Sequence, residues 1–190
     1  MHNLLHPITA RVVAFGCLLL SSACDSPEKF SWENHPTLSW NDFIGTNVRF
    51  RPGYAAATHS GFTAVSNCID GTWDIWVTAE FYVLTSWVRP NGKTPLVLKH
   101  EQGHFDITEL YARKLRKAIR DARISCENMA QAVAAVERIT DQSAMDTRAA
   151  HKQYDTATKG EREPDPIAQA AASNSIANEL ASLDSYKSNR

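Results

Sequence analysis

One segment of the sequence, residues 95–122, restricts the fold more than any other, because it combines the marks of a long helix with a metal-binding pattern. Thr94 is a favourable N-cap for this helix, and Pro95 is a favourable first-turn residue. Apolar residues then recur at helical spacing, and lysines and arginines crowd the last two turns, where they suit the negative end of the helix dipole. Residues 100–104 of this predicted helix read His-Glu-Gln-Gly-His.

The spacing of the two histidines predicts a zinc site. Residues four apart lie on one face of a helix, so His100 and His104 can direct ring nitrogens at a single point. Glu101 is offset by about 100° and stays outside the ligand set, within reach of a water on the metal. Zinc lowers the pKa of such a water to about 7, and a glutamate can take its proton as the water attacks a carbonyl. The alternative is a solvated polar helix face, but apolar residues on both sides of the motif favour a buried helix start.

The third ligand is open from spacing alone. Asp106 and Glu109 lie on other sides of the predicted helix and are expected to be surface carboxylates. A second long helix, predicted over about residues 127–157, carries His151 and Asp155 four apart on one face. If it runs antiparallel to the first helix, it can bring that face to the metal. The candidates are therefore Asp155, His151 and Glu109.

Upstream of the motif, residues 38–88 predict short β-strands separated by turns. The strongest strand signal is residues 72–88, which are rich in aromatic and β-branched side chains. Alternation within this run predicts one apolar face, made of Ile75, Val77, Ala79, Phe81 and Val83. The predicted fold is α+β and zincin-like: a small antiparallel sheet packed on the motif helix and on a second long helix.

The beginning of the chain predicts export. Arg11 precedes an apolar run that is too short to span a bilayer and ends in small residues, so residues 1–23 are expected to be a cleaved signal. Cys24 follows directly and is expected to be the lipidated first residue of a lipoprotein, with an ordinary signal-peptidase site as the alternative. The expected organisation continues with a linker over 24–35, a metallopeptidase-like domain over 36–160, and a weakly ordered Ala- and Ser-rich tail over 161–190. The tail is expected to be either a weakly ordered helix or a flexible end.

Cysteine content and charge add two further expectations. Cys68 and Cys126 remain after the signal and Cys24, and in an oxidising compartment they are expected to form one disulfide. The alternative is a pair of buried free thiols. The formal net charge of -1 argues against binding to nucleic acid, which requires a basic surface.

Several stretches resemble a bacterial family of predicted secreted zinc-dependent proteases, the domain-of-unknown-function 922 group. They read LSWNDFIG, VTAEFYVLTSWV, LKHEQGHFDITELYARKLR and the later QYD, and the resemblance covers about residues 36–160. The most specific piece is HEQ-x-HFDI-x-E, which residues 100–109 match. The resemblance implies a zincin-like metallopeptidase.

The family pattern often continues as Tyr-Asp-x-x-Thr-x-His-Gly. This chain keeps Tyr154, Asp155 and Thr158 but has Gly160 where the histidine would fall. Asp155 is therefore favoured as the third zinc ligand. Tyr154 is expected to donate a hydrogen bond to the developing oxyanion, with packing in the core as the alternative. His59 could also reach the site from a loop, although a surface position is favoured.

The sequence thus predicts an exported zinc metallopeptidase that hydrolyses peptide bonds in envelope proteins or peptides, in the periplasm, at the cell envelope or in the medium. Two alternatives belong to other classes. One is an envelope lipoprotein that binds metal without turnover, and the other is an interaction module that binds no metal.

Overall fold

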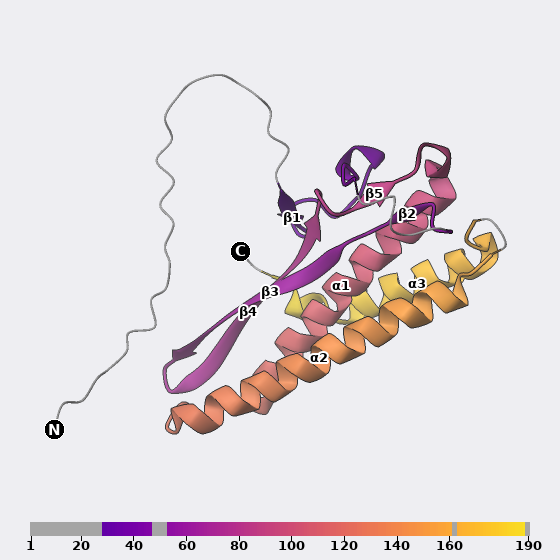
Figure 1. Ribbon diagram of the computed structural model, residues 1–190. Coiled ribbons are helices and arrows are strands. Elements are labelled where there is room, and N and C mark those ends of the chain that lie inside the picture. The colour runs from indigo at the N-terminus through magenta and orange to yellow at the C-terminus, as the bar shows by residue number, and fades with distance from the viewer. Residues whose placement is uncertain (1–27, 47–52, 161–162, 189–190) are drawn as a thin grey trace, which may run out of the picture.

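The computed structural model describes residues 28–46, 53–160 and 163–188 (Figure 1). The predicted signal and Cys24 lie outside the described residues. In chain order the elements are β1 (Lys29–Ser31), η1 (Trp40–Asp42), β2 (Ala56–Ala57), β3 (Ser60–Ile69), β4 (Thr72–Tyr82), β5 (Trp87–Val88), η3 (Pro90–Gly92), α1 (Pro95–Ala122), α2 (Met129–Ala157), α3 (Pro166–Ser182) and η4 (Asp184–Tyr186). The fold is α+β, as the sequence predicted.

The strands form one three-stranded and one two-stranded antiparallel sheet in the described part of the chain. The larger sheet has the order β1-β4-β3, and the smaller one pairs β2 with β5. A two-residue turn of Asp70 and Gly71 joins β3 to β4, and both residues have positive φ, 49° and 77°. An Asp-Gly pair with positive φ at both positions is the preferred connection of a tight hairpin, because its twist matches that of the strands.

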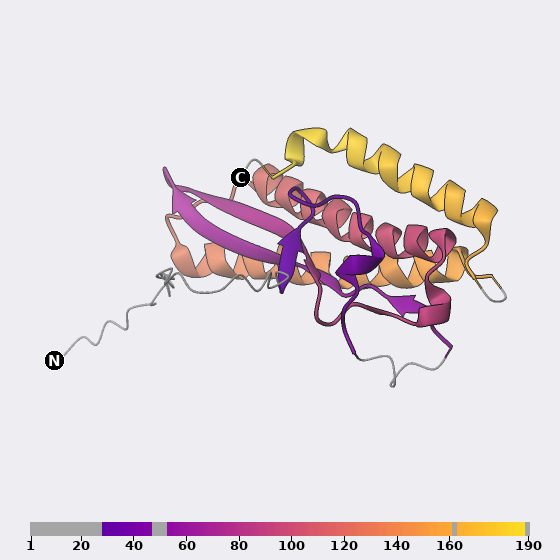
Figure 2. The ribbon, with the colours of Figure 1, turned by 90° about the horizontal axis from the view of Figure 1, so that it is seen from above.

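Helix α1 lies at the centre of the molecule and packs against the sheet, α2 and α3. Figure 2 shows it between the sheet and α3. The predicted apolar face is confirmed, since the four of its side chains that lie in β4 and Val83, directly after β4, are all buried. Ile75, Val77 and Ala79 pack against Leu115 and Ile119 of α1, forming the main core cluster.

The predicted helix boundaries agree with the structure. The Thr94 side chain accepts a hydrogen bond from the Val97 backbone nitrogen at 3.2 Å, which caps α1 one residue before Pro95. The sequence predicts a second helix from about residue 127, and α2 begins at Met129 after the N-cap Asn128. Capping depends on a few neighbouring residues, which is why it can be read locally.

Most of the Ala- and Ser-rich tail forms helix α3, in agreement with the helical one of its two expected forms. Asp165 caps α3 by accepting hydrogen bonds from two backbone nitrogens, and Ile176 and Leu180 are buried in a cluster with Leu110 of α1. Within the predicted linker, Lys29–Ser31 forms β1 and pairs with the end of β4. Both segments gain their order from contacts with α1 and β4, which their own short or weakly patterned sequences do not display.

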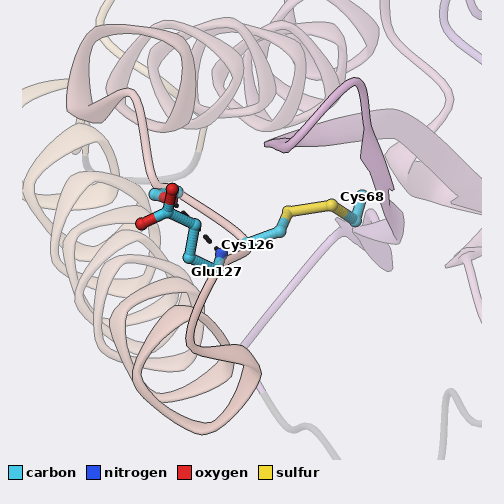
Figure 3. Close-up of a disulfide and its surroundings, with 4 residues drawn as sticks. Cys68, Cys126 and Glu127 are labelled. Carbon is cyan, nitrogen blue, oxygen red and sulfur yellow. Dashed lines mark hydrogen bonds between the residues drawn. A yellow bond between two sulfur atoms is a disulfide. The ribbon is translucent and has the colours of Figure 1, made fainter.

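The predicted disulfide is present. Cys68 and Cys126 are bonded with their Cα atoms 6.2 Å apart, across a sequence separation of 58 residues (Figure 3). The bond ties the end of β3 to the connection between α1 and α2. Within the described ranges, no helix is long and apolar enough to cross a membrane.

Candidate metal centre

Three predicted ligands converge between α1 and α2. His100 and His104 lie one turn apart in the first half of α1, and Asp155 lies in the last turn of α2. One ligand atom from each of them lies within 4.8 Å of the others. Asp155 Oδ1 is 3.3 Å from His100 Nε2 and 3.0 Å from His104 Nε2. The antiparallel second helix therefore brings a carboxylate to both imidazoles, and this group could hold a metal ion.

The charges of the three side chains are coupled. Burial opposes the charged form of Asp155, yet hydrogen bonds from both histidines hold its pKa well below the usual range. Burial likewise opposes protonation of His100, but the hydrogen bond to Asp155 and the negative charge of Glu101 outweigh it and raise the pKa of His100 above its usual 6.5. In the metal-free protein the site thus combines an ionised carboxylate with an imidazole that holds its proton more tightly.

His151 lies beside the group, on the other side of His104. Its Nδ1 is 3.0 Å from His104 Nδ1, whereas the Nε2 atom of His104 faces Asp155. Burial and the neighbouring His104 lower the pKa of His151 to about 4, so its ring is neutral at pH 7. Among the described residues, the group that could hold a metal contains Asp155 and not His151.

The expectation that Glu109 and Asp106 are surface carboxylates is wrong. Glu109 is fully buried and accepts hydrogen bonds from Arg113 at 2.8 Å and from Arg116 at 3.2 Å. Asp106 is partly buried and accepts a hydrogen bond from the Trp32 indole at 2.9 Å. Both carboxylates are engaged in the packing of α1, and neither lies in the His–His–Asp group.

Glu101 is 4% exposed and borders a cavity of about 230 Å³. Its Oε2 accepts a hydrogen bond of 2.6 Å from the backbone nitrogen of Thr58, and the Thr58 hydroxyl donates to the Glu101 backbone oxygen at 3.1 Å. These bonds tie the segment after β2 to the motif. The cavity is lined by Tyr54, Ala56, Ala57, Thr58, Ser60, His100, Glu101, His104, His151 and Asp155.

Tyr154 packs directly on the motif helix. Its ring stacks on His100 with centroids 4.9 Å apart, and its hydroxyl donates to the His100 backbone oxygen at 3.2 Å. Burial raises the pKa of Tyr154, which keeps the phenol protonated. Tyr154 is absent from the described residues that line the cavity. Its role as an oxyanion donor stays a prediction, and a hydroxyl in that role would have to leave its bond to His100.

Gly103 is a position at the candidate site whose importance for packing the sequence did not reveal. A Cβ atom added to Gly103 would lie 2.0 Å from the Tyr154 hydroxyl oxygen and 2.4 Å from its Cζ. Only glycine therefore leaves room for the phenol to lie across the helix. A glycine between the two histidines of the motif is the available signal, since glycine inside a helix costs stability unless close packing requires it.

Two further polar residues at the site were also missed. Gln169 of α3 and Thr158 after α2 are both fully buried, and each places an oxygen 3.2 Å from His100 Nδ1. No pattern in the sequence links Gln169 to the motif, because the contact spans 69 residues. Thr158 belongs to the Tyr-Asp-x-x-Thr pattern, which was the one available signal.

The two remaining sequence candidates lie outside the group. His59 is exposed, and its Nδ1 is 2.6 Å from the Thr85 hydroxyl. At Gly160, where the related pattern has histidine, an added Cβ would lie 2.0 Å from the backbone oxygen of Glu163. The turn after α2 therefore has no room for a side chain at this position.

The fold and the site define an α+β domain with a His–His–Asp group, on two helices, that could hold a metal ion. Residues 82–161 match the model of a family described as "Bacterial protein of unknown function (DUF922)". The matched segment contains the motif and Asp155, and it ends before α3. No curated protein and no solved structure matches the chain. The match supports the family resemblance, and the family's description assigns no activity.

Proposed function

We propose that the protein is an exported, zincin-like metallopeptidase with zinc held by His100, His104 and Asp155. The observation that carries this proposal is the convergence of two Nε2 atoms and one carboxylate oxygen beside Glu101, at the wall of a cavity. Two histidines and one carboxylate form a common protein ligand set of catalytic zinc, which keeps a further position open.

The surroundings of the ligands fit a cation. Asp155 is ionised and contacts both imidazoles through the same nitrogen atoms that a metal would use. The opposite nitrogen of His100 faces buried oxygens of Gln169 and Thr158, and an imidazole N–H donated to an oxygen is the usual support of a metal-bound histidine. This donor set favours zinc over magnesium or calcium, which prefer oxygen ligands alone.

Glu101 is the proposed general base. When bound, zinc supplies a Lewis acid that polarises the scissile carbonyl and lowers the pKa of water. The Thr58 backbone nitrogen holds Glu101 Oε2 and so fixes the plane of the carboxylate. Within the described residues, Oε1 has no hydrogen-bond partner, so it is the oxygen placed to accept a proton from the attacking water and pass it to the leaving amine.

Peptides or proteins are the proposed substrates. β2 and its flanking residues form one wall of the cavity, and a strand at the rim of a cleft can hold an extended peptide by main-chain hydrogen bonds. Export is supported by the signal-like segment before residue 24 and by the disulfide, which suits an oxidising compartment. Envelope proteins are the substrates that such a location provides, with a lipid on Cys24 as the proposed membrane tether.

A second candidate, a metal-binding protein without turnover, is favoured by one observation. The Thr58 backbone nitrogen donates to Glu101 Oε2 at 2.6 Å, so this oxygen is already engaged and is not free to take a proton from water. In that case the site would hold zinc, and Glu101 would serve only to connect the motif with the segment after β2.

Metal analysis followed by one substitution separates these functions. Mature protein purified without chelator should hold about one zinc per chain. His104→Ala should abolish binding, whereas the matched control His59→Ala, at an exposed histidine outside the site, should retain it. Glu101→Gln should keep the metal and lose hydrolysis of a casein-like substrate. Unchanged hydrolysis would remove Glu101 as the base, and a metal-free wild-type protein would leave only the interaction module.

A further inference from the structure

We propose that Gln169 of α3 is a positioning residue for the metal ligand His100; this inference rests on the proposed zinc site. Gln169 is fully buried, although glutamine seldom is. A buried amide needs partners for both its oxygen and its nitrogen, because an unpaired polar group in the interior is costly. The partners of Gln169 lead to the metal site.

Gln169 is connected to His100 by one direct hydrogen bond and by a second path through Tyr154. Its Oε1 lies 3.2 Å from His100 Nδ1, and its Nε2 donates to the Tyr154 hydroxyl at 2.5 Å. The hydroxyl in turn donates to the backbone oxygen of His100 at 3.2 Å. One amide thus holds the ring of the histidine directly and its main chain through a phenol.

The direction of these bonds is determined by the partners. The Tyr154 hydroxyl donates its single proton to the His100 carbonyl, so it must accept from the Gln169 nitrogen. The same nitrogen donates to the Ser173 hydroxyl at 3.2 Å. The amide oxygen is therefore the atom that faces His100, and it can only accept. His100 must carry a proton on Nδ1, so Nε2 is the nitrogen that faces Asp155 and the metal position. Nε2 can bind a metal once it has released the proton that it donates to Asp155.

Thr158 supports the same arrangement. Its hydroxyl donates to the Tyr154 backbone oxygen at 2.8 Å, so its oxygen is also an acceptor for His100 Nδ1, at 3.2 Å. The proton on Nδ1 is therefore shared between two buried oxygens. Removing Gln169 leaves Thr158 in place, and the expected loss lies toward the lower end of the 10- to 100-fold range typical of such supporting groups.

This arrangement assigns α3 a role in metal binding. The helix lies beyond the family-matched residues 82–161, and its own sequence is a weakly patterned Ala- and Ser-rich run. Of the buried residues of α3, Ile176 and Leu180 pack in an apolar cluster, whereas Gln169 contacts the site. Metal affinity should therefore depend on a side chain from outside the matched segment.

The test is a competition titration of zinc against a chromophoric chelator. Gln169→Met, which keeps the size and removes both polar atoms, should bind zinc on the order of 10-fold more weakly than wild type. Gln169→Glu keeps an acceptor for Nδ1 and should restore most of the affinity. Ser173→Ala removes the other partner of the amide and should bind as wild type does. Urea denaturation of each metal-free variant confirms that it is folded.

Wild-type affinity in Gln169→Met, or an equal loss in Gln169→Glu, would overturn the positioning role. Nuclear magnetic resonance of the metal-free wild type gives a readout that needs neither zinc nor a variant. A slowly exchanging proton should be found on His100 Nδ1, close to the Gln169 side chain. If the wild type binds no zinc but shows this proton, the proposed function is refuted, whereas the orientation of His100 by Gln169 is supported. If the proton is absent, the positioning of His100 by Gln169 is refuted.

Discussion

The contact between Gly103 and Tyr154 predicts that Gly103→Ala lowers the free energy of unfolding, whereas the same substitution in an open helix raises it. In an open helix, Gly→Ala stabilises by about 0.5–1 kcal/mol, because alanine loses less conformational freedom on folding. Here the added Cβ would lie 2.0 Å from the Tyr154 hydroxyl oxygen, inside a site where Tyr154 is only 5% exposed. Such overpacking costs about 1–3 kcal/mol, and each displaced hydroxyl hydrogen bond costs about 1 kcal/mol more. Gly103→Ala should therefore destabilise the protein by about 2–4 kcal/mol.

Urea denaturation of the metal-free protein measures this effect. The matched control is the same substitution in a Tyr154→Ala background, where the phenol is gone. There Gly103→Ala should be neutral or stabilising by up to about 1 kcal/mol. A stabilised Gly103→Ala single variant, or the same destabilisation in both backgrounds, would refute the argument that the phenol requires a glycine.

Three further predictions concern the disulfide, the buried charges and the pH dependence. The Cys68–Cys126 bond closes a 58-residue loop, so its reduction should lower the free energy of unfolding by up to about 4 kcal/mol, as measured by denaturant titration. Thiol labelling of the unreduced protein should find neither cysteine free. Glu109→Gln should destabilise by about 3 kcal/mol, because it removes the buried carboxylate that Arg113 and Arg116 share and leaves each arginine with only its less buried carboxylate partner, Asp184 or Glu33. Zinc affinity should not change, and a loss of zinc would mean that Glu109 is a ligand after all. Zinc affinity should fall as the pH is lowered through the pKa of His100, because His100 must release a proton to bind zinc. Since this pKa is raised, the fall should begin above pH 6.5. Chelator competition at several pH values measures the affinity, and a constant affinity would contradict the prediction.

The pKa shifts of His100 and Asp155 also determine how the stability of the metal-free protein changes with pH. The raised pKa of His100 stabilises the fold below pH 6.5, and this contribution is lost as the pH rises through the folded value. The depressed pKa of Asp155 stabilises above pH 3.8, and this contribution is lost as the pH falls through the folded value. Their mutual contribution should therefore be greatest between about pH 4 and 6.5, and Asp155→Asn should remove it in unfolding experiments at pH 5.5.

Local sequence was sufficient for the scaffold of the site. The start of α1 at Thr94 and Pro95, the shared face of His100 and His104, and the apolar face of β4 all follow from spacing within a few residues. Helical and strand periodicities are properties of the backbone, so they act before any long-range contact forms. The disulfide could be inferred as well, because only two cysteines remained to be paired.

Tertiary structure decided what surrounds those histidines. Asp155 contacts both histidines, whereas His151 contacts His104 alone. This difference depends on the rotation of α2 against α1, which no spacing within one helix specifies. The burial of Glu109 required its arginine partners, and the requirement for Gly103 arose from a phenol 51 residues away. Gln169 reached the site only because α3 folds back along α1, and the free energy of such a contact comes from the packing of the helices, not from the sequence near the residue.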